Sequence, residues 1–283
     1  MIATLLRQLL GLAAATIVTI APWAAAWAAD ASPWDADARA GVRLIAGGTT
    51  RALDAPLRAG VELKLAPGWK TYWRYPGDSG VPPRFDFAGS QNVKSVEVAW
   101  PAPHRFTDDS GTSIGYKAAV VFPLRIVPQN AAKPVLLHLK LDYAVCEKLC
   151  VPAEGRVELT LDGVGPTFDD ALAAAEAAVP KQAKLGDRAP LAVRAVRREA
   201  GGDHPRIVVD VAAPETPLDL FAEGPTPDWG LPLPEPTPGA PAGLHRFVFA
   251  LDGVPPGTNP KGAVLTFTLE SGPNAIEVAA HLD

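Results

Sequence analysis

Alternating hydrophobic and polar positions predict a protein built mainly from short β-strands. Apolar side chains recur at every second position in residues 61–65, 93–98, 120–127, 135–143 and 156–161, and again in residues 191–197, 206–211, 245–251, 263–269 and 275–280. Pro-Gly, Pro-Pro and Asp-Ser-Gly steps, which favour turns, separate many of these runs. Short strands at such regular spacing indicate β-sandwiches, one in residues 30–165 and a second in residues 189–283.

One segment between the two sets of strands has the pattern of an α-helix. Residues 167–179 are rich in alanine, begin with Thr167 as the expected N-cap, carry two aspartates in the first turn and end before Pro180. We expect this helix and a polar linker, together residues 166–188, to join the two sandwiches.

The N-terminus has the pattern of a secretory signal peptide. Arg7 precedes an apolar run over residues 9–22, which is followed by small residues up to Asp30. We expect cleavage after Ala28, which makes residues 1–28 the signal peptide, with the bond after Ala26 as the alternative. An uncleaved membrane anchor is the competing interpretation, but the apolar run is short for a span. The mature protein is therefore expected in an exported compartment where cysteines can be oxidised.

The chain has only two cysteines, Cys146 and Cys150, and they directly follow the strand predicted over residues 135–143. The pair could be a structural disulfide, a metal clip or a redox centre. The five histidines are scattered, and none lies at ligand spacing from another or from a cysteine, so we expect no metal and no other cofactor. The net charge of −5, without a basic cluster, argues against a nucleic-acid partner.

A second candidate for chemistry is the segment GDSG at residues 77–80, which resembles the nucleophile segment of chymotrypsin-like proteases. The same letters after a proline are also a common turn sequence, and all five histidines follow Ser79 in the chain. The turn is the favoured interpretation.

Physical arguments weaken a purely structural role for the cysteines without excluding it. Closing so short a loop contributes roughly 2 kcal/mol in the chain-entropy model, and a domain of well over one hundred residues has a core of its own. The pair also flanks the tip between two predicted strands, where a partner can reach the sulfurs, and short exposed disulfides are the more easily reduced ones. A structural disulfide and a redox centre both remain open at this point.

Four stretches of the first predicted sandwich resemble the N-terminal periplasmic domain of the disulfide-bond reductase DsbD and its ScsB-like relatives. They are PGWKTYWRYPGDSGVPP (67–83), WPAPHRF (100–106), IGYKAAVVFPLRI (114–126) and LDYAVCEKLCVPAEGRVELTL (141–161). The helix and the second predicted sandwich resemble the longer, two-domain periplasmic segment of the ScsB-like branch. The resemblance implies two immunoglobulin-like β-sandwiches, with a redox cysteine pair at the edge of the first.

The resemblance also implies roles for individual residues. Cys146 and Cys150 match the redox pair as a disulfide, with Cys150 the expected attacking thiol, and Tyr72 matches a tyrosine that lines the family's active site. The remaining candidates around the site are an acidic cap loop and a substitute for its missing aromatic residue. These are Asp108 and Asp109 in the cap loop, and Phe106, Ile114 or Tyr116 as the aromatic substitute. Apart from the resemblance, the positive charges of Lys148 and Lys117 could either stabilise a thiolate or be solvated surface charges, and Glu147 and the two aspartates would raise a thiol pKa.

The function implied by the resemblance is a periplasmic thiol–disulfide oxidoreductase of the protein-disulfide reductase type. Such a domain relays electrons from a membrane-embedded thiol reductase to thioredoxin-fold periplasmic proteins, among them disulfide isomerases and cytochrome c maturation factors. The family's cysteines are spaced more widely than here, and the electron donor is expected to be a separate protein. The alternative is a non-catalytic periplasmic scaffold with a structural disulfide, for which a proline-rich loop over residues 224–241 would expose Trp229 as a contact.

Overall fold

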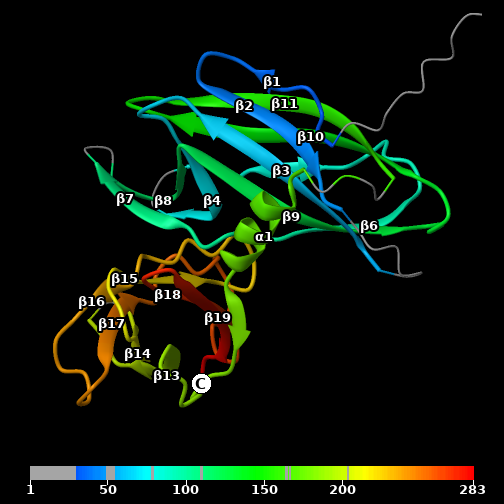
Figure 1. The fold of residues 1–283 in the computed structure, drawn as a ribbon. Helices are drawn as coiled ribbons and strands as arrows, with labels where there is room; N and C mark the ends of the chain where they lie inside the picture. Colours follow the sequence, from blue (N-terminus) through cyan, green and yellow to red (C-terminus); the bar gives the residue numbers. More distant parts are fainter. Residues whose placement is uncertain are drawn as a thin grey trace, which may run out of the picture.

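The computed structural model describes residues 30–48, 55–77, 80–108, 111–162, 165, 167–202 and 204–283. These residues form two β-sandwiches, one above the other in Figure 1, with helix α1 at their junction. The predicted mainly β architecture is confirmed. The signal peptide expected in residues 1–28 lies outside the described residues. Within the part of the chain that is described, no helix has the length and apolar character needed to span a membrane.

The first sandwich packs a five-stranded sheet against a six-stranded sheet. The first sheet has the order β1 (Asp35–Ala36), β2 (Ala40–Ala46), β3 (Leu57–Leu65), β9 (Ala119–Pro128) and β6 (Val93–Val98). The second has the order β11 (Cys150–Leu161), β10 (Val135–Cys146), β4 (Lys70–Gly77), β8 (Gly111–Lys117) and β7 (His104–Asp108), with β5 (Arg84–Asp86) paired to β10. The alternation along β10 buries Leu137, Leu139 and Leu141 between the sheets, as the sequence predicted.

The second sandwich consists of two four-stranded sheets. One has the order β12 (Lys181–Ala183), β19 (Asn274–His281), β18 (Val264–Ser271) and β15 (Leu218–Glu223). The other has the order β13 (Ala192–Glu199), β14 (Arg206–Ala212), β17 (His245–Ala250) and β16 (Glu235–Pro236). Strand β12 pairs in parallel with β19, so part of the segment expected to be a linker is a strand of the second sandwich.

Helix α1 (Asp169–Ala177) is shorter than the helix predicted over residues 167–179. The expected N-cap is wrong, because Phe168 occupies that position and the hydroxyl of Thr167 donates a hydrogen bond to Asp30 instead. The buried side chain of Leu172 fits over Gly60 of β3, where an added Cβ would come within 2.8 Å of a Leu172 methyl carbon. The helix is therefore held to the first sandwich by this apolar contact, for which a glycine makes room, and by ion pairs of Arg58 on β3 with Asp169 and Glu176.

Trp229 is buried, in contrast to the exposed position expected from its proline-rich surroundings. Its side chain is 3% exposed and belongs to the core of the second sandwich. The indole lies against Gly224, where any Cβ would collide with it. Trp229 itself therefore offers no exposed contact of the kind that the scaffold alternative expected.

The two sandwiches meet along β4. Trp73 of this strand packs against Phe221 of β15 with 5.8 Å between ring centroids, and its neighbour Arg74 is ion-paired with Glu223 at 2.7 Å and with Glu277. The hydroxyl of Tyr75, the next residue, donates a hydrogen bond to a backbone carbonyl of the second sandwich. Three consecutive residues of one strand thus hold the second sandwich in place.

A second contact at the junction starts from β7. Arg105 is ion-paired with Asp219 at 2.8 Å and with Glu235 at 2.6 Å, both on strands of the second sandwich.

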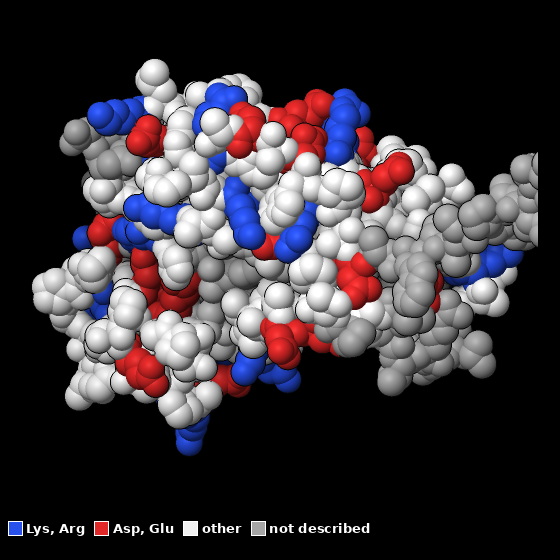
Figure 2. Space-filling model, turned by 45° about the horizontal axis from the view of Figure 1, so that its top comes forward, with Lys and Arg blue, Asp and Glu red and all other residues white. Residues whose placement is uncertain are grey.

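Outside these pairs, charges are spread over the surface. On the face shown in Figure 2, basic and acidic side chains are intermixed, and neither sign forms a broad continuous patch.

Candidate functional site

The cysteines lie at the tip of the β10–β11 hairpin and form a disulfide. The strand register places Cys146 directly opposite Cys150, with Glu147, Lys148 and Leu149 forming the connecting turn. The long alternating run that the sequence showed before and after the cysteines thus extends the hairpin to its tip. The disulfide therefore closes the free end of a hairpin whose other end is embedded in the core.

The two sulfurs differ in their access to solvent. Cys146 is 2% exposed and packs with Tyr72 and Ala144 in a small buried cluster. Cys150 is exposed. The residues next to Cys146 show why: Val145 and Tyr143 face the main core, so the period of two turns Ala144 and Cys146 to the opposite face of the sheet. Only one member of the pair is therefore open to attack from outside.

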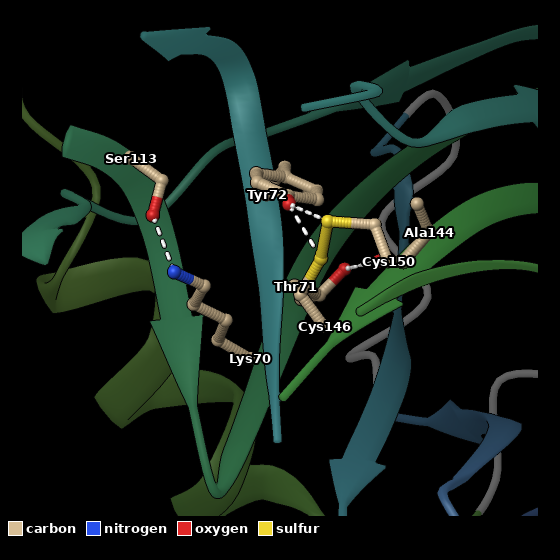
Figure 3. Close-up of a disulfide and its surroundings, with 7 residues drawn as sticks. All are labelled: Lys70, Thr71, Tyr72, Ser113, Ala144, Cys146 and Cys150. Carbon is tan, nitrogen blue, oxygen red and sulfur yellow. Dashed lines mark hydrogen bonds between the residues drawn. A yellow bond between two sulfur atoms is a disulfide. The ribbon is translucent and has the colours of Figure 1, made fainter. Parts of the chain in front are cut away.

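The hydroxyl of Tyr72 bridges the disulfide. Its oxygen lies 2.8 Å from Cys146 Sγ and 2.9 Å from Cys150 Sγ (Figure 3). Because the sulfurs of a disulfide carry no proton, the phenol is the donor in both contacts. The ring is 1% exposed, so the hydroxyl is aimed at the sulfurs from below the surface.

Strand β4 holds Tyr72 in this position through contacts on both sides. Thr71 donates a hydrogen bond of 2.9 Å to the carbonyl of Ala144 on β10, which joins the tyrosine strand to the cysteine strand. Lys70, directly opposite Cys146, is buried and extends to Ser113 on β8, with 2.9 Å between Nζ and Oγ (Figure 3). Sequence reasoning missed Lys70 and Thr71, although they immediately precede the tyrosine that the family stretch identified.

The other predicted site residues lie in different places, some on the surface and one in the core. Glu147 and Lys148 are exposed on the turn between the cysteines. Tyr116 lies on the core face of its sheet, where its hydroxyl donates a hydrogen bond of 2.8 Å to the carbonyl of Pro101 and burial raises its pKa well above the ordinary value. It is thus a core residue and not a neighbour of the sulfurs.

The predicted cap loop follows β7. Asp108 is the last residue of that strand, and Asp109 lies outside the described residues. Two of the residues expected to replace the missing cap-loop aromatic differ in burial. Ile114 is buried in the core, whereas Phe106 is half-buried on β7. The amine of Lys117 lies over the Phe106 ring, 4.2 Å from its centroid, so this lysine is engaged with the aromatic side chain.

The described residues contain no arrangement for holding a metal ion. Within the described ranges, no group of three or more histidine, cysteine, aspartate or glutamate side chains could bind one. The chemistry available at the hairpin tip is that of sulfur: one reachable sulfur, one shielded sulfur, and a hydrogen-bond donor directed at both.

Fold and site together define a class: a β-sandwich protein with a disulfide at the exposed tip of an edge hairpin. Residues 44–162 match the family model described as "Thiol:disulfide interchange protein DsbD, N-terminal". The first sandwich thus matches the DsbD N-terminal family, and this match supports a role in thiol–disulfide exchange.

A solved structure resembles the chain over both sandwiches. The N-terminal periplasmic domain of ScsB from Proteus mirabilis superposes with a TM-score of 0.68 at 22% sequence identity, covering 89% of this chain and 98% of that one. The likeness extends the agreement in fold beyond the residues of the family match and supports two immunoglobulin-like sandwiches. Comparison with curated proteins gave no sequence relative.

Proposed function

We propose that this protein is a periplasmic thiol–disulfide oxidoreductase that passes electrons from a membrane-embedded thiol reductase to thioredoxin-fold proteins through Cys146 and Cys150. The observation that carries the proposal is the asymmetry of the disulfide, with Cys150 exposed and Cys146 buried against the Tyr72 hydroxyl. The family match of residues 44–162 supports the reaction type, and the signal peptide expected in residues 1–28 supports the compartment.

In the first half of the cycle, a thiolate of the electron donor attacks Cys150 Sγ, because this is the sulfur that solvent reaches. A bond forms between the donor sulfur and Cys150, the Cys146–Cys150 bond breaks, and Cys146 leaves as a thiolate. The Tyr72 hydroxyl, already 2.8 Å from that sulfur, stabilises the new charge by donating its hydrogen bond. The donor's second thiol then displaces Cys150, which leaves the donor oxidised and the pair reduced by two electrons.

The second half runs in the opposite direction on a different protein. The Cys150 thiolate attacks a disulfide of the acceptor, forming a mixed disulfide and releasing one acceptor sulfur as a thiolate. Cys146 then attacks Cys150 Sγ, restores the internal disulfide and frees the second acceptor sulfur. Because Cys146 lies directly opposite Cys150 in the hairpin, it is positioned to resolve the mixed disulfide without movement of the strands.

Trapping experiments test the proposed roles of the two cysteines. The Cys146→Ser variant keeps the exposed Cys150 and lacks the resolving thiol. In its reduced form it should accumulate a mixed disulfide with a thioredoxin variant that keeps a single active-site cysteine, supplied as the mixed disulfide with thionitrobenzoate, because the released thionitrobenzoate leaves the complex. The Cys150→Ser variant keeps only the buried Cys146 and should accumulate much less. Non-reducing electrophoresis followed by mass spectrometry measures both. Equal trapping, or none by either variant, would contradict the proposal.

A redox titration separates a working pair from an inert one. A structural disulfide in an exported protein typically has a reduction potential below about −300 mV, whereas a relay between cellular thiols requires a higher one. We expect the wild-type pair to titrate above that value in glutathione or dithiothreitol buffers. A lower potential would assign the disulfide to structure.

A further inference from the structure

Large hydrophobic side chains are seldom exposed in the described part of this protein, and those that are have a distinctive placement. Leu149 is 79% exposed, Val81 55% and Leu185 42%. Single exposed apolar residues are ordinary on protein surfaces. Here, however, Leu149 directly precedes a cysteine of the disulfide, and Val81 directly follows a glycine that packs against Tyr72.

Leu149 is the residue directly before Cys150, in the turn that joins the two cysteines. Its neighbours in the turn, Glu147 and Lys148, are charged and exposed, as is usual for a hairpin tip. Leu149 is the most exposed large hydrophobic residue of the described chain, so it contributes little to the core. The fold gives no reason for a leucine at this position.

Val81 is next in sequence to a residue that packs against Tyr72. It follows Gly80, whose backbone lies so close to the Tyr72 ring that an added Cβ would come within 2.5 Å of ring carbons. The ring in turn carries the hydroxyl that touches both sulfurs. Leu149 thus directly precedes the exposed cysteine, and Val81 directly follows the glycine that lies against the Tyr72 ring.

A partner that forms a bond to Cys150 must bring its own surface onto this tip. Side chains next to the bonded sulfur are then removed from water, and an apolar side chain gains free energy from that burial. A polar side chain in the same place would lose hydration without a compensating bond. An apolar side chain beside the reactive sulfur is therefore suited to a partner whose own cysteine is surrounded by apolar surface.

Resting on the proposed function, we propose that Leu149 and Val81 form the docking contact for the thioredoxin-fold partner that exchanges with Cys150. The contact acts on protein partners and not on the intrinsic reactivity of the disulfide. A small thiol such as dithiothreitol needs only the sulfur, whereas a protein must also fit the surface around it. Leu149 and Val81 are in this sense specificity residues that favour partners with an apolar rim.

The test compares two reductants on the same protein. The oxidised full-length mature protein is mixed with reduced bacterial thioredoxin or with dithiothreitol, and the second-order rate constants are measured for the wild type, Leu149→Ser, Val81→Ser and Leu149→Met. We expect Leu149→Ser to slow the reaction with thioredoxin by about fivefold or more, in line with loss of a buried interface anchor. Its rate with dithiothreitol should stay unchanged, and Leu149→Met should restore the thioredoxin rate.

Leu185→Ser serves as the matched control, because Leu185 is exposed and lies in the second sandwich's lead-in segment and not at the hairpin tip. It should react with both reductants like the wild type. Equal thioredoxin rates for Leu149→Ser and the wild type would overturn the docking contact. So would a parallel loss with both reductants, which would assign Leu149 to the reactivity of the disulfide itself. A wild-type protein that dithiothreitol reduces and thioredoxin does not would overturn the proposed function, and the docking contact with it.

Discussion

Arg74 on β4 is hydrogen-bonded through Nε and one terminal nitrogen to the carboxylate of Glu223 on β15, at 2.9 and 2.7 Å. The pair joins the first sandwich to the second only two residues beyond Tyr72, the tyrosine that bridges the disulfide. The strand that positions the redox site is thus also the strand on which the second sandwich is mounted. This connection suggests a structural task for the second sandwich, namely to hold β4 in register beside the cysteine hairpin.

Replacement of Arg74 by methionine should weaken both the junction and the site. Glu223 and Glu277 would lose their shared cation in a partly buried setting, which we expect to lower the free energy of unfolding by about 2–4 kcal/mol. Arg156→Met is the control, because its pair with Glu154 is largely exposed and should change stability by less than about 1 kcal/mol. Urea unfolding measures both variants, and equal losses would count against a special role of the junction.

The phenol of Tyr72 should accelerate release of Cys146. In Tyr72→Phe the ring still fills its buried position, but the leaving thiolate has no donor, and a hydrogen bond to a charged group is worth about 1.5–3 kcal/mol. Reduction by dithiothreitol should therefore slow by about tenfold or more. Stopped-flow fluorescence or quenched alkylation would follow the reaction.

Tyr116→Phe is the matched control for that measurement. Its hydroxyl donates to the carbonyl of Pro101 on the core face, so its removal should cost about 1 kcal/mol of stability and leave the exchange rate unchanged. If Tyr116→Phe slowed exchange as much as Tyr72→Phe, the effect would be due to general loosening of the sheet. The assignment of Tyr72 to the leaving group would then fail.

Glu270 should make the protein less stable as the pH rises through neutrality. Burial, and secondarily the charge of Asp219 across the strand pair, raise the pKa of this carboxyl to about 8, against an ordinary value of 4.5. Between these two values the folded protein binds the proton and the unfolded chain does not, so each rise in pH favours unfolding. The free energy of unfolding should fall by about 3 kcal/mol between pH 5 and pH 8 on this account.

Glu270→Gln mimics the protonated carboxyl at every pH and should remove that part of the slope. The variant should match the wild type near pH 4 and exceed its stability at pH 8. Denaturant titrations at a series of pH values would show the difference. A wild-type slope that persists unchanged in Glu270→Gln would mean that another group is responsible.

Gly115 allows the close approach of β8 to β4 behind the redox site. A Cβ at this position would collide with the backbone oxygen of Thr71, which cannot move aside as a flexible side chain could. Gly115→Ala should cost about 3 kcal/mol of stability and disturb Tyr72, which faces Gly115 in the strand register. Gly202→Ala, which meets no atom within 4 Å, should change the thermal midpoint little. Similar midpoints for the two variants would show that the strands can separate without cost.

The sequence predicted elements well where local pattern and tertiary environment agree. The hairpin β10–β11 alternates strictly, its inward side chains are apolar, and its tip carries the cysteines, so it could be located from the letters alone. Strand β4 could not, because Lys70 and Thr71 are polar yet buried and find their partners in Ser113 and Ala144, which are distant in the chain. Proline content predicted an exposed loop around Trp229, but Gly224 makes room for the indole in the core.

At the candidate site, too, some features could be predicted from the sequence and others could not. The cysteines and Tyr72 were identifiable from the resemblance, and the structure brings them within hydrogen-bonding distance. Which sulfur is shielded depends on the face of the sheet to which Cys146 is turned, and that is settled by the core packing of Tyr143 and Val145. Tyr116 illustrates the converse, since its proximity in sequence to the cap region gave no information about the face it occupies.

The position of β4 at the junction affects what truncation or exchange of the second sandwich would do to this protein. A fragment ending near residue 165 would retain the disulfide and every described side chain that touches it, but it would expose the Trp73 face to water and leave Arg74 without its carboxylates. A hybrid that attaches a foreign second sandwich would need an aromatic residue in place of Phe221 and an acid in place of Glu223 to rebuild the seam. An exchange of the second sandwich between such proteins is therefore expected to preserve the junction only when the residues on both sides of β4 are transferred together.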